Sequence, residues 1–159
     1  MAVFEARPKS LFSWGYELRR GTLVVARMDM TWLSEGGSFT WEGIGYRLSR
    51  QGFWSGDFLL EGAGQIPARA TKPSPFRRHF EVHVGPRVLA LEAVSPLTRA
   101  FRLLENGSLV GAVTPRSFFS RCCTVDFPDD LPVPVQVFLF WLVVLMWRRA
   151  ANSSAAGAS

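Results

Sequence analysis

The apolar run at residues 132–149 constrains the fold of this chain more than any other feature. Its sequence is PVPVQVFLFWLVVLMWRR, in which Gln136 is the only polar residue between Val135 and Trp147. A helix that is apolar on every side is buried either in a protein core or in a lipid bilayer. In a protein core, the rest of the chain must surround the helix, whereas in a bilayer it need not. The length of the apolar run helps to decide between the two.

Length favours a core helix. Residues 135–147 would extend about 20 Å as a helix, whereas the hydrocarbon layer of a bilayer is about 30 Å thick. Pro134 suits the first turn of such a helix. A short tail anchor is the alternative, because Arg148 and Arg149 would also suit the cytoplasmic flank of a membrane span. We predict a core helix over about residues 133–149. Its core residues are Val135, Val137, Phe138, Leu139, Phe140, Trp141, Leu142, Val143, Val144, Leu145, Met146 and Trp147.

The chain before this run consists of short β-like segments separated by turn residues. About eleven such segments recur at spacings of about 8–12 residues, which is typical of a β-sandwich or a β-barrel. Asn106-Gly107 is the strongest hairpin signal among the turns. The expected strands cover residues 11–19, 22–29, 38–42, 45–50, 58–60, 65–70, 78–84, 88–93, 101–104, 109–113 and 120–127, with a short helical turn at 30–33.

An internal repeat supports the pairing of these strands. The sequence GQIPARATKPSPFRRHFEV begins at Gly64, and the related GSLVGAVTPRSFFSRCCTV begins 43 residues later at Gly107. An aromatic-x-Leu pattern precedes each copy, at Phe58 and Phe101, and a weaker third copy begins at Tyr16. A fixed period of this kind indicates a repeated pair of strands.

The faces of the strands indicate what the sheet covers. Phe80 and Val82 alternate with His79 and Glu81, so one face is apolar and the other polar. A curved sheet of this kind needs an apolar partner, which the apolar helix supplies, and closure of the sheet removes its exposed edges. We therefore predict a mainly β fold, a closed antiparallel barrel of about twelve strands around a hydrophobic C-terminal helix.

The length of 159 residues fits one domain. We expect the barrel over residues 11–149, a loose N-terminal segment at 1–10 and a disordered tail at 150–159. The first ten residues lack the apolar core of a secretory signal. The adjacent Cys122 and Cys123 fit neither a disulfide framework nor a zinc site, so we expect a cytoplasmic protein.

These features resemble the tubby C-terminal-like superfamily, which includes the tubby proteins, the phospholipid scramblases, the plant LURP-one-related proteins and small bacterial relatives. The resemblance covers about residues 11–149. It rests on the series of strands, on the G-x-[IL]…T…S-x-F-x-R pattern that ends at Arg78 and at Arg121, and on the final FLFWLVVLMW. It implies a twelve-stranded barrel threaded by a hydrophobic helix, and it suggests membrane association and lipid binding.

Basic residues at equivalent ends of the two clear repeats are the leading candidate for a binding site. The chain carries a formal net charge of +5, and arginine clusters bind phosphate groups well. The candidate residues are Arg69, Lys72, Arg77, Arg78, Arg116 and Arg121. A solvated rim is the alternative, and the matching positions of Arg78 and Arg121 also suit a structural role in bonding loop carbonyl groups.

A metal site is a further candidate. His79, Glu81 and His83 share one face of a strand, and such side chains can bind zinc or iron. The alternative is an ordinary polar outer face, because a site needs more ligands from other strands. The sequence contains no nucleophile elbow, P-loop or dinucleotide-binding motif, and no nucleic-acid-binding module. We expect no cofactor and no nucleic-acid partner.

The sequence thus favours a non-enzymatic barrel that docks on anionic phospholipid or on an acidic protein through a basic rim. Such a protein would be cytoplasmic and peripheral at the inner membrane face. One alternative is a tail-anchored integral membrane protein with a cytosolic β domain. The other is a metal-dependent barrel enzyme.

Overall fold

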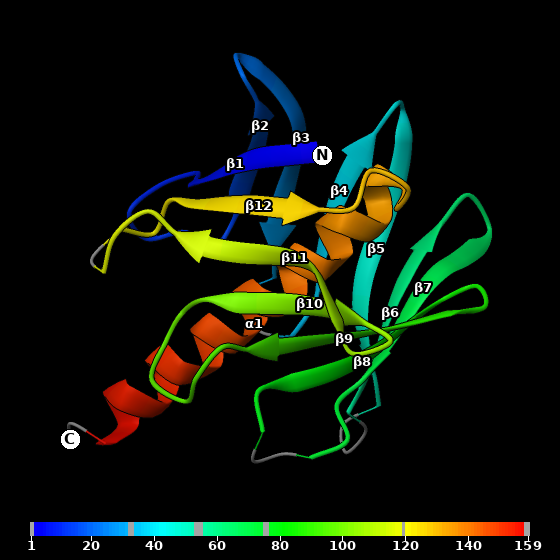
Figure 1. Cartoon of the computed structure of the whole chain (residues 1–159). Helices are drawn as coiled ribbons and strands as arrows, with labels where there is room; N and C mark the ends of the chain where they lie inside the picture. The colour runs from blue at the N-terminus through cyan, green and yellow to red at the C-terminus, as the bar shows by residue number, and fades with distance from the viewer. Residues whose placement is uncertain (1, 32–33, 53–55, 75–76, 119, 158–159) are drawn as a thin grey trace.

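The computed structural model describes residues 2–31, 34–52, 56–74, 77–118 and 120–157. These residues form twelve antiparallel strands that close into a barrel, and one helix (Figure 1). The strands are β1 (Ala2–Pro8), β2 (Tyr16–Arg20), β3 (Leu23–Met30), β4 (Gly37–Trp41), β5 (Ile44–Gln51), β6 (Asp57–Gly62), β7 (Gln65–Thr71), β8 (His79–Val84), β9 (Arg87–Ala93), β10 (Phe101–Glu105), β11 (Ser108–Pro115) and β12 (Cys123–Phe127). Each strand pairs with its neighbours in the chain, and β1 closes the barrel against β12.

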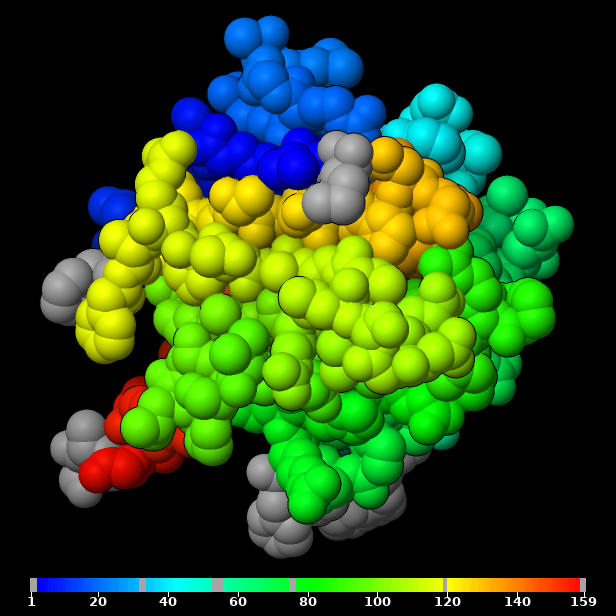
Figure 2. Space-filling view, in the orientation of Figure 1, coloured from blue at the N-terminus to red at the C-terminus, as the bar shows by residue number. Residues whose placement is uncertain are grey.

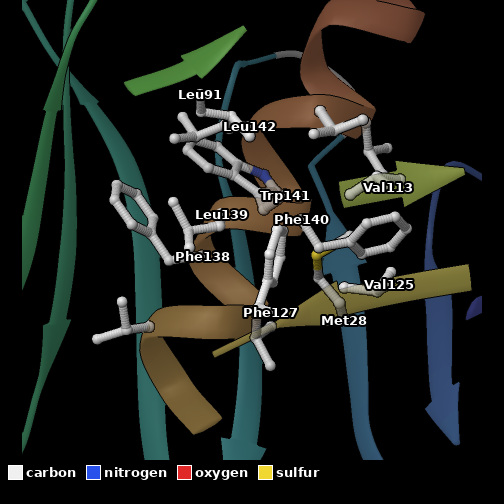
Figure 3. Close-up of a cluster of buried hydrophobic side chains, with 14 of the residues drawn as sticks. Met28, Leu91, Val113, Val125, Phe127, Phe138, Leu139, Phe140, Trp141 and Leu142 are labelled. Atoms are coloured by element: carbon white, nitrogen blue, oxygen red, sulfur yellow. The ribbon is translucent and has the colours of Figure 1, made fainter. Parts of the chain in front are cut away.

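The helix α1 (Val133–Gly157) fills the barrel. Residues 134–147 are buried, including Gln136, whose side-chain amide donates a hydrogen bond to the carbonyl of Leu131 at 2.8 Å. In Figure 3, Phe138, Phe140 and Trp141 of the helix lie among apolar side chains of the strands. By length and hydropathy this helix could cross a membrane, but 78% of its most apolar window is buried inside the molecule. The predicted barrel around an apolar helix is confirmed.

The two ends of the barrel differ. Short connections at 21–22, 42–43, 63–64, 85–86 and 106–107 lie at one end, which we call the turn end. Asn106 and Gly107 have φ values of 51° and 77°, as the predicted hairpin turn requires. The longer connections at 9–15, 31–36, 52–56, 72–78, 94–100 and 116–122 lie at the other end, which we call the loop end. The helix enters at the turn end after β12 and leaves at the loop end (Figure 1).

The sequence repeat is a structural repeat. The hairpins β2–β3, β6–β7 and β10–β11 each contain a register shift next to the leucine of the aromatic-x-Leu pattern. The equivalent buried residues are Tyr16 and Leu18, Phe58 and Leu60, and Phe101 and Leu103. A bulge at the same place in all three hairpins indicates that the barrel consists of three related four-stranded units.

The prediction of a loose N-terminal segment at residues 1–10 is wrong for most of its length. Ala2–Pro8 is β1, and it pairs with both β2 and β12. Phe4 and Ala6 are buried in the barrel. The apolar alternation in this strand is too short to stand out in the sequence, and its second pairing partner comes from the other end of the domain.

Two further predictions differ from the structure. The tail predicted to be disordered at 150–159 is helical as far as Gly157, because its alanines favour the helix and α1 continues into it without a break. The helical turn predicted at 30–33 is wrong at Met30, which ends β3. Residues 32–33 and 158–159 lie outside the described residues.

Candidate functional site

Charge is distributed unevenly between the two ends of the barrel. The connections at the loop end contain the basic residues Lys9, Lys72, Arg77, Arg78, Arg99, Arg116 and Arg121, and the acidic residue Glu35. Arg148 and Arg149 of α1 lie at the same end. The described connections at the turn end contain Glu42, Asp129 and Asp130 and no basic residue. The connections at the loop end are therefore basic, and those at the turn end are acidic.

Arg78 holds the neighbouring connection at 94–100. Its Nη1 donates hydrogen bonds to the carbonyl oxygens of Thr98, at 2.7 Å, and of Pro96, at 3.4 Å. The guanidinium carbon lies 5.1 Å from the centre of the Phe101 ring. Burial lowers the pKa of Arg78 from its ordinary value, yet an arginine remains charged at neutral pH. Arg78 thus links a loop carbonyl to the first aromatic residue of a repeat.

Arg121, at the matching position of the next repeat, holds the connection at 9–15 in the same way. Its Nη1 donates to the carbonyls of Ser10, at 3.2 Å, and Leu11, at 3.0 Å, and its Nη2 donates to the carbonyl of Ser13. The guanidinium carbon lies 5.8 Å from the centre of the Tyr16 ring. The structural role foreseen for the matching arginines, bonding loop carbonyls, is confirmed.

The helix end supplies the third guanidinium of this kind. Arg149 lies 5.7 Å from the ring of Phe58, the equivalent of Tyr16 and Phe101. It forms two hydrogen bonds of 2.5 Å with Glu35, which stands 43 residues before Arg78 and so occupies the corresponding place in the first repeat. Burial alone would raise the pKa of the Glu35 carboxyl, but Arg149 and Arg50 outweigh it and lower that pKa. This ion pair, which we call the Glu35–Arg149 clasp, thus fixes α1 to the barrel where the helix leaves the interior.

A pocket of about 400 Å³ opens between this clasped helix and the loops. We call it the exit pocket, and its main lining residues are Trp14, Arg78, Arg99, Arg121 and Trp147. None of the described residues that line it is acidic. Three guanidinium groups and two indole rings around one hollow suit a ligand that combines an anionic group with apolar parts.

Arg99 and Trp147 support each other in this pocket. The indole Nε1 of Trp147 donates to the Arg99 carbonyl at 3.0 Å, and the Arg99 guanidinium carbon lies 4.7 Å from the centre of the Trp147 ring. Arg99 Nη1 also donates to the carbonyl of Ser120 at 2.7 Å. Arg99 is not among the site residues predicted from the sequence. One signal for it was available, since Arg99 precedes Phe101 by the same two residues that separate Trp14 from Tyr16.

The other predicted basic residues do not join the exit pocket. Lys72 donates to the carbonyl of Ser74 at 2.5 Å, and burial, aided by the charge of Arg149, lowers its pKa. Arg116 bonds Glu5 at 2.9 Å. Arg69 lies on β7 opposite His83, and Arg77 is exposed in the connection at 72–78. Of the six candidates, the structure brings only Arg78 and Arg121 into the pocket.

The metal candidates lie on the outer wall of β8. His79 Nδ1 lies 3.3 Å from a carboxylate oxygen of Glu92, whereas His83 Nε2 lies 2.7 Å from one of Glu81. The two imidazoles are therefore paired with different carboxylates. Across the described part of the chain, no three His, Cys, Asp or Glu side chains are grouped so that they could hold a metal ion.

Comparisons with protein-family models, with curated proteins and with solved structures found no match to this chain. Function is therefore inferred from the charge, shape and contacts of the loop end.

Proposed function

We propose that this chain is a non-enzymatic, tubby-like and scramblase-like barrel protein that binds anionic phospholipid at its loop end. It would act as a cytoplasmic protein, peripheral at the inner membrane face. The observation that carries the proposal is the exit pocket, which places Arg78, Arg99 and Arg121 around one hollow without an acidic residue among its described lining. Guanidinium groups are well suited to phosphate because their donors are fixed in one plane.

Two guanidinium groups in the pocket have N–H donors that could bind a phosphate. Arg78 and Arg99 each use Nη1 for a loop carbonyl, and the described residues provide no partner for the Nη2 of either side chain. The loop bonds hold each guanidinium in place, so little side-chain freedom would be lost on binding a phosphate. A volume of about 400 Å³ is within the ordinary range for small-ligand pockets.

The electrostatic field of the whole barrel would reinforce this site. The basic loop end would face an anionic surface, and the acidic residues of the turn end would face away from it. We do not propose the tail-anchored alternative, because residues 134–147 form the core of the barrel and would leave it hollow if withdrawn. An acidic protein remains the second candidate partner, favoured by the same charges.

Vesicle sedimentation tests the proposal. The protein should sediment with phosphatidylcholine vesicles that contain phosphatidylserine and stay in solution with pure phosphatidylcholine, and added salt should weaken the binding. Arg99→Gln should reduce the affinity about fivefold or more, because it removes a charged donor from the pocket. The matched control is Arg47→Gln, since Arg47 is exposed on β5 and pairs with Glu61 at 2.6 Å outside the pocket.

Equal sedimentation with both kinds of vesicle, or with neither, would refute the proposal. A related measurement is an alkaline carbonate wash of membranes from cells that express the protein. A peripheral protein should be released by the wash, whereas a tail anchor would keep it in the pellet until detergent is added.

A further inference from the structure

Several large apolar side chains at the loop end are almost fully exposed. Leu11 and Phe12 are 87% exposed, Leu97 is 95% exposed and Phe118 is 83% exposed. They come from three different connections, at 9–15, 94–100 and 116–122. Single exposed apolar residues are common on protein surfaces, but a cluster at one end of a molecule indicates a contact surface.

The three connections are neighbours around the barrel. They join β9 to β10, β11 to β12 and β1 to β2, and these six strands are consecutive in the closed sheet. The same three connections supply Trp14, Arg99 and Arg121 to the exit pocket. Leu97 lines the pocket itself, whereas Leu11, Phe12 and Phe118 belong to the connections that supply Trp14 and Arg121 to it. Figure 2 shows the yellow β11–β12 connection and the red end of α1 standing out from the body on the same side.

The turn end lacks tips of this kind within the described residues. Its exposed apolar side chains lie near the ends of strands and are 38% to 67% exposed. They are Val3, Leu23, Ile44, Ile66, Val88 and Leu109. The turn end also carries acidic connections, so only the loop end combines strongly exposed apolar tips with basic charge.

We infer that the loop end inserts the tips Leu11, Phe12, Leu97 and Phe118 into the interface of an anionic bilayer, with the exit pocket placed over the phospholipid headgroups. The inference rests on the proposed function. It adds how the barrel is oriented on the membrane and how deeply its loop end enters the bilayer. Apolar tips gain free energy when they leave water for the acyl boundary, and basic groups beside them meet the headgroup phosphates.

A bilayer is the partner that fits these tips best, because a fluid interface has no fixed shape. Side chains from three separate loops can enter it together whatever the distances between them. A protein partner would need a separate apolar pocket for each tip. The excess of basic groups around the tips matches the negative surface of an anionic membrane. The same orientation places the exposed helical residues 150–157 beside the headgroups, since Ala150, Ala151 and Ser154 line the pocket.

The test compares two sets of substitutions in the full chain. The tip variant carries Leu11→Ser, Phe12→Ser and Phe118→Ser, and it keeps Leu97 because that residue also lines the exit pocket. The control variant carries Leu23→Ser, Ile66→Ser and Leu109→Ser at the turn end. Both sets alter exposed residues, so the far-UV circular dichroism and the unfolding midpoint should stay close to those of the parent protein.

Three measurements then separate insertion from phosphate binding. The tip variant should lose at least about tenfold in affinity for phosphatidylserine-containing vesicles, while the control variant keeps the parent affinity. The parent protein should raise the surface pressure of a phosphatidylserine monolayer, and the tip variant should not. Both variants should bind the water-soluble glycerophosphoserine as the parent does, because none of the substituted residues lines the exit pocket.

The outcomes distinguish the inference from the proposed function. If the tip variant binds vesicles and enters the monolayer as the parent does, insertion is refuted while phospholipid binding stands. Equal losses in the tip and control variants would also refute it. If the parent binds neither anionic vesicles nor glycerophosphoserine but binds polyglutamate, the proposed lipid function fails, and the insertion inference fails with it.

Discussion

At the scale of single residues, three guanidinium groups lie over three equivalent aromatic rings. Arg78 and Arg121 come from matching loop positions, and the third group comes from Arg149 on the helix. Glu35 replaces the arginine of the first repeat and binds Arg149. The repeat offset alone predicts the first pair. The Glu35–Arg149 pair was not predictable, because its members are 114 residues apart and meet only in the closed barrel.

Arg121 should be the most sensitive loop anchor. Arg121→Gln removes a guanidinium that donates to three carbonyls, so we expect the free energy of unfolding to fall by about 1–3 kcal/mol. Urea denaturation followed by tryptophan fluorescence measures this change. The control is Arg77→Gln, at an exposed position in an equivalent connection, with an expected change below about 0.5 kcal/mol. Equal effects of the two substitutions would contradict the anchoring role.

The Glu35–Arg149 clasp should make stability depend on acidic pH. The pKa of Glu35 is lowered in the folded protein, so the clasp contributes fully above the ordinary carboxyl range and is lost as the pH falls through the folded-state pKa. We expect Glu35→Gln to cost about 1 kcal/mol at neutral pH and almost nothing at about pH 2. Denaturant titrations of both proteins at the two pH values measure the difference. A cost that stays constant with pH would show that the carboxylate charge is not responsible.

At the scale of elements, α1 determines the interior. Its start and its apolar segment were predictable because local signals mark them, namely Pro134 in the first turn and the long apolar run that follows. Its end was not, since the alanine-rich residues after Arg149 are compatible with both helix and coil. The strands were found by turn signals and alternation, whereas β1 was missed because its place depends on pairing with β12 at the far end of the domain.

Trp141 should contribute more to stability than any exposed residue of the helix. It is fully buried, and its ring meets Phe58 edge-to-face at 5.8 Å and stacks on Phe138 at 6.0 Å. Trp141→Ala would leave a large cavity, and we expect it to lower the free energy of unfolding by about 3–5 kcal/mol. Thermal and urea unfolding followed by circular dichroism test this. Asn152→Ala, on the exposed part of the same helix, should have little effect.

At the scale of the whole molecule, the order of the strands gives the two ends of the barrel different surfaces. Tight turns between strands gather at one end, and the longer connections between strands gather at the other, so basic residues and exposed apolar tips collect there. The barrel class was predictable from alternation and from the apolar helix. The exit pocket was not, because Arg99 and Trp147 lie 48 residues apart and are joined only by the path of the helix through the barrel.

Removal of β1 should open the barrel. A chain that lacks residues 1–8 would leave the edges of β2 and β12 without a partner, and open edges of this kind pair with other chains. We expect this variant to aggregate, as measured by size-exclusion chromatography and light scattering. A chain that lacks residues 152–159 should instead elute like the intact protein, because residues 152–157 are exposed. Normal elution of the first variant would show that β1 is dispensable for closure.

The order in which the chain is synthesised gives the central helix a further consequence. The strands leave the ribosome before residues 134–147, whose side chains fill the space between them, and β1 can pair with β12 only after β12 has been synthesised. Local hairpins can form early, yet no complete core exists until the final helix has emerged. A chain that is terminated before α1 would therefore expose the whole apolar lining of the sheet and would be prone to aggregate.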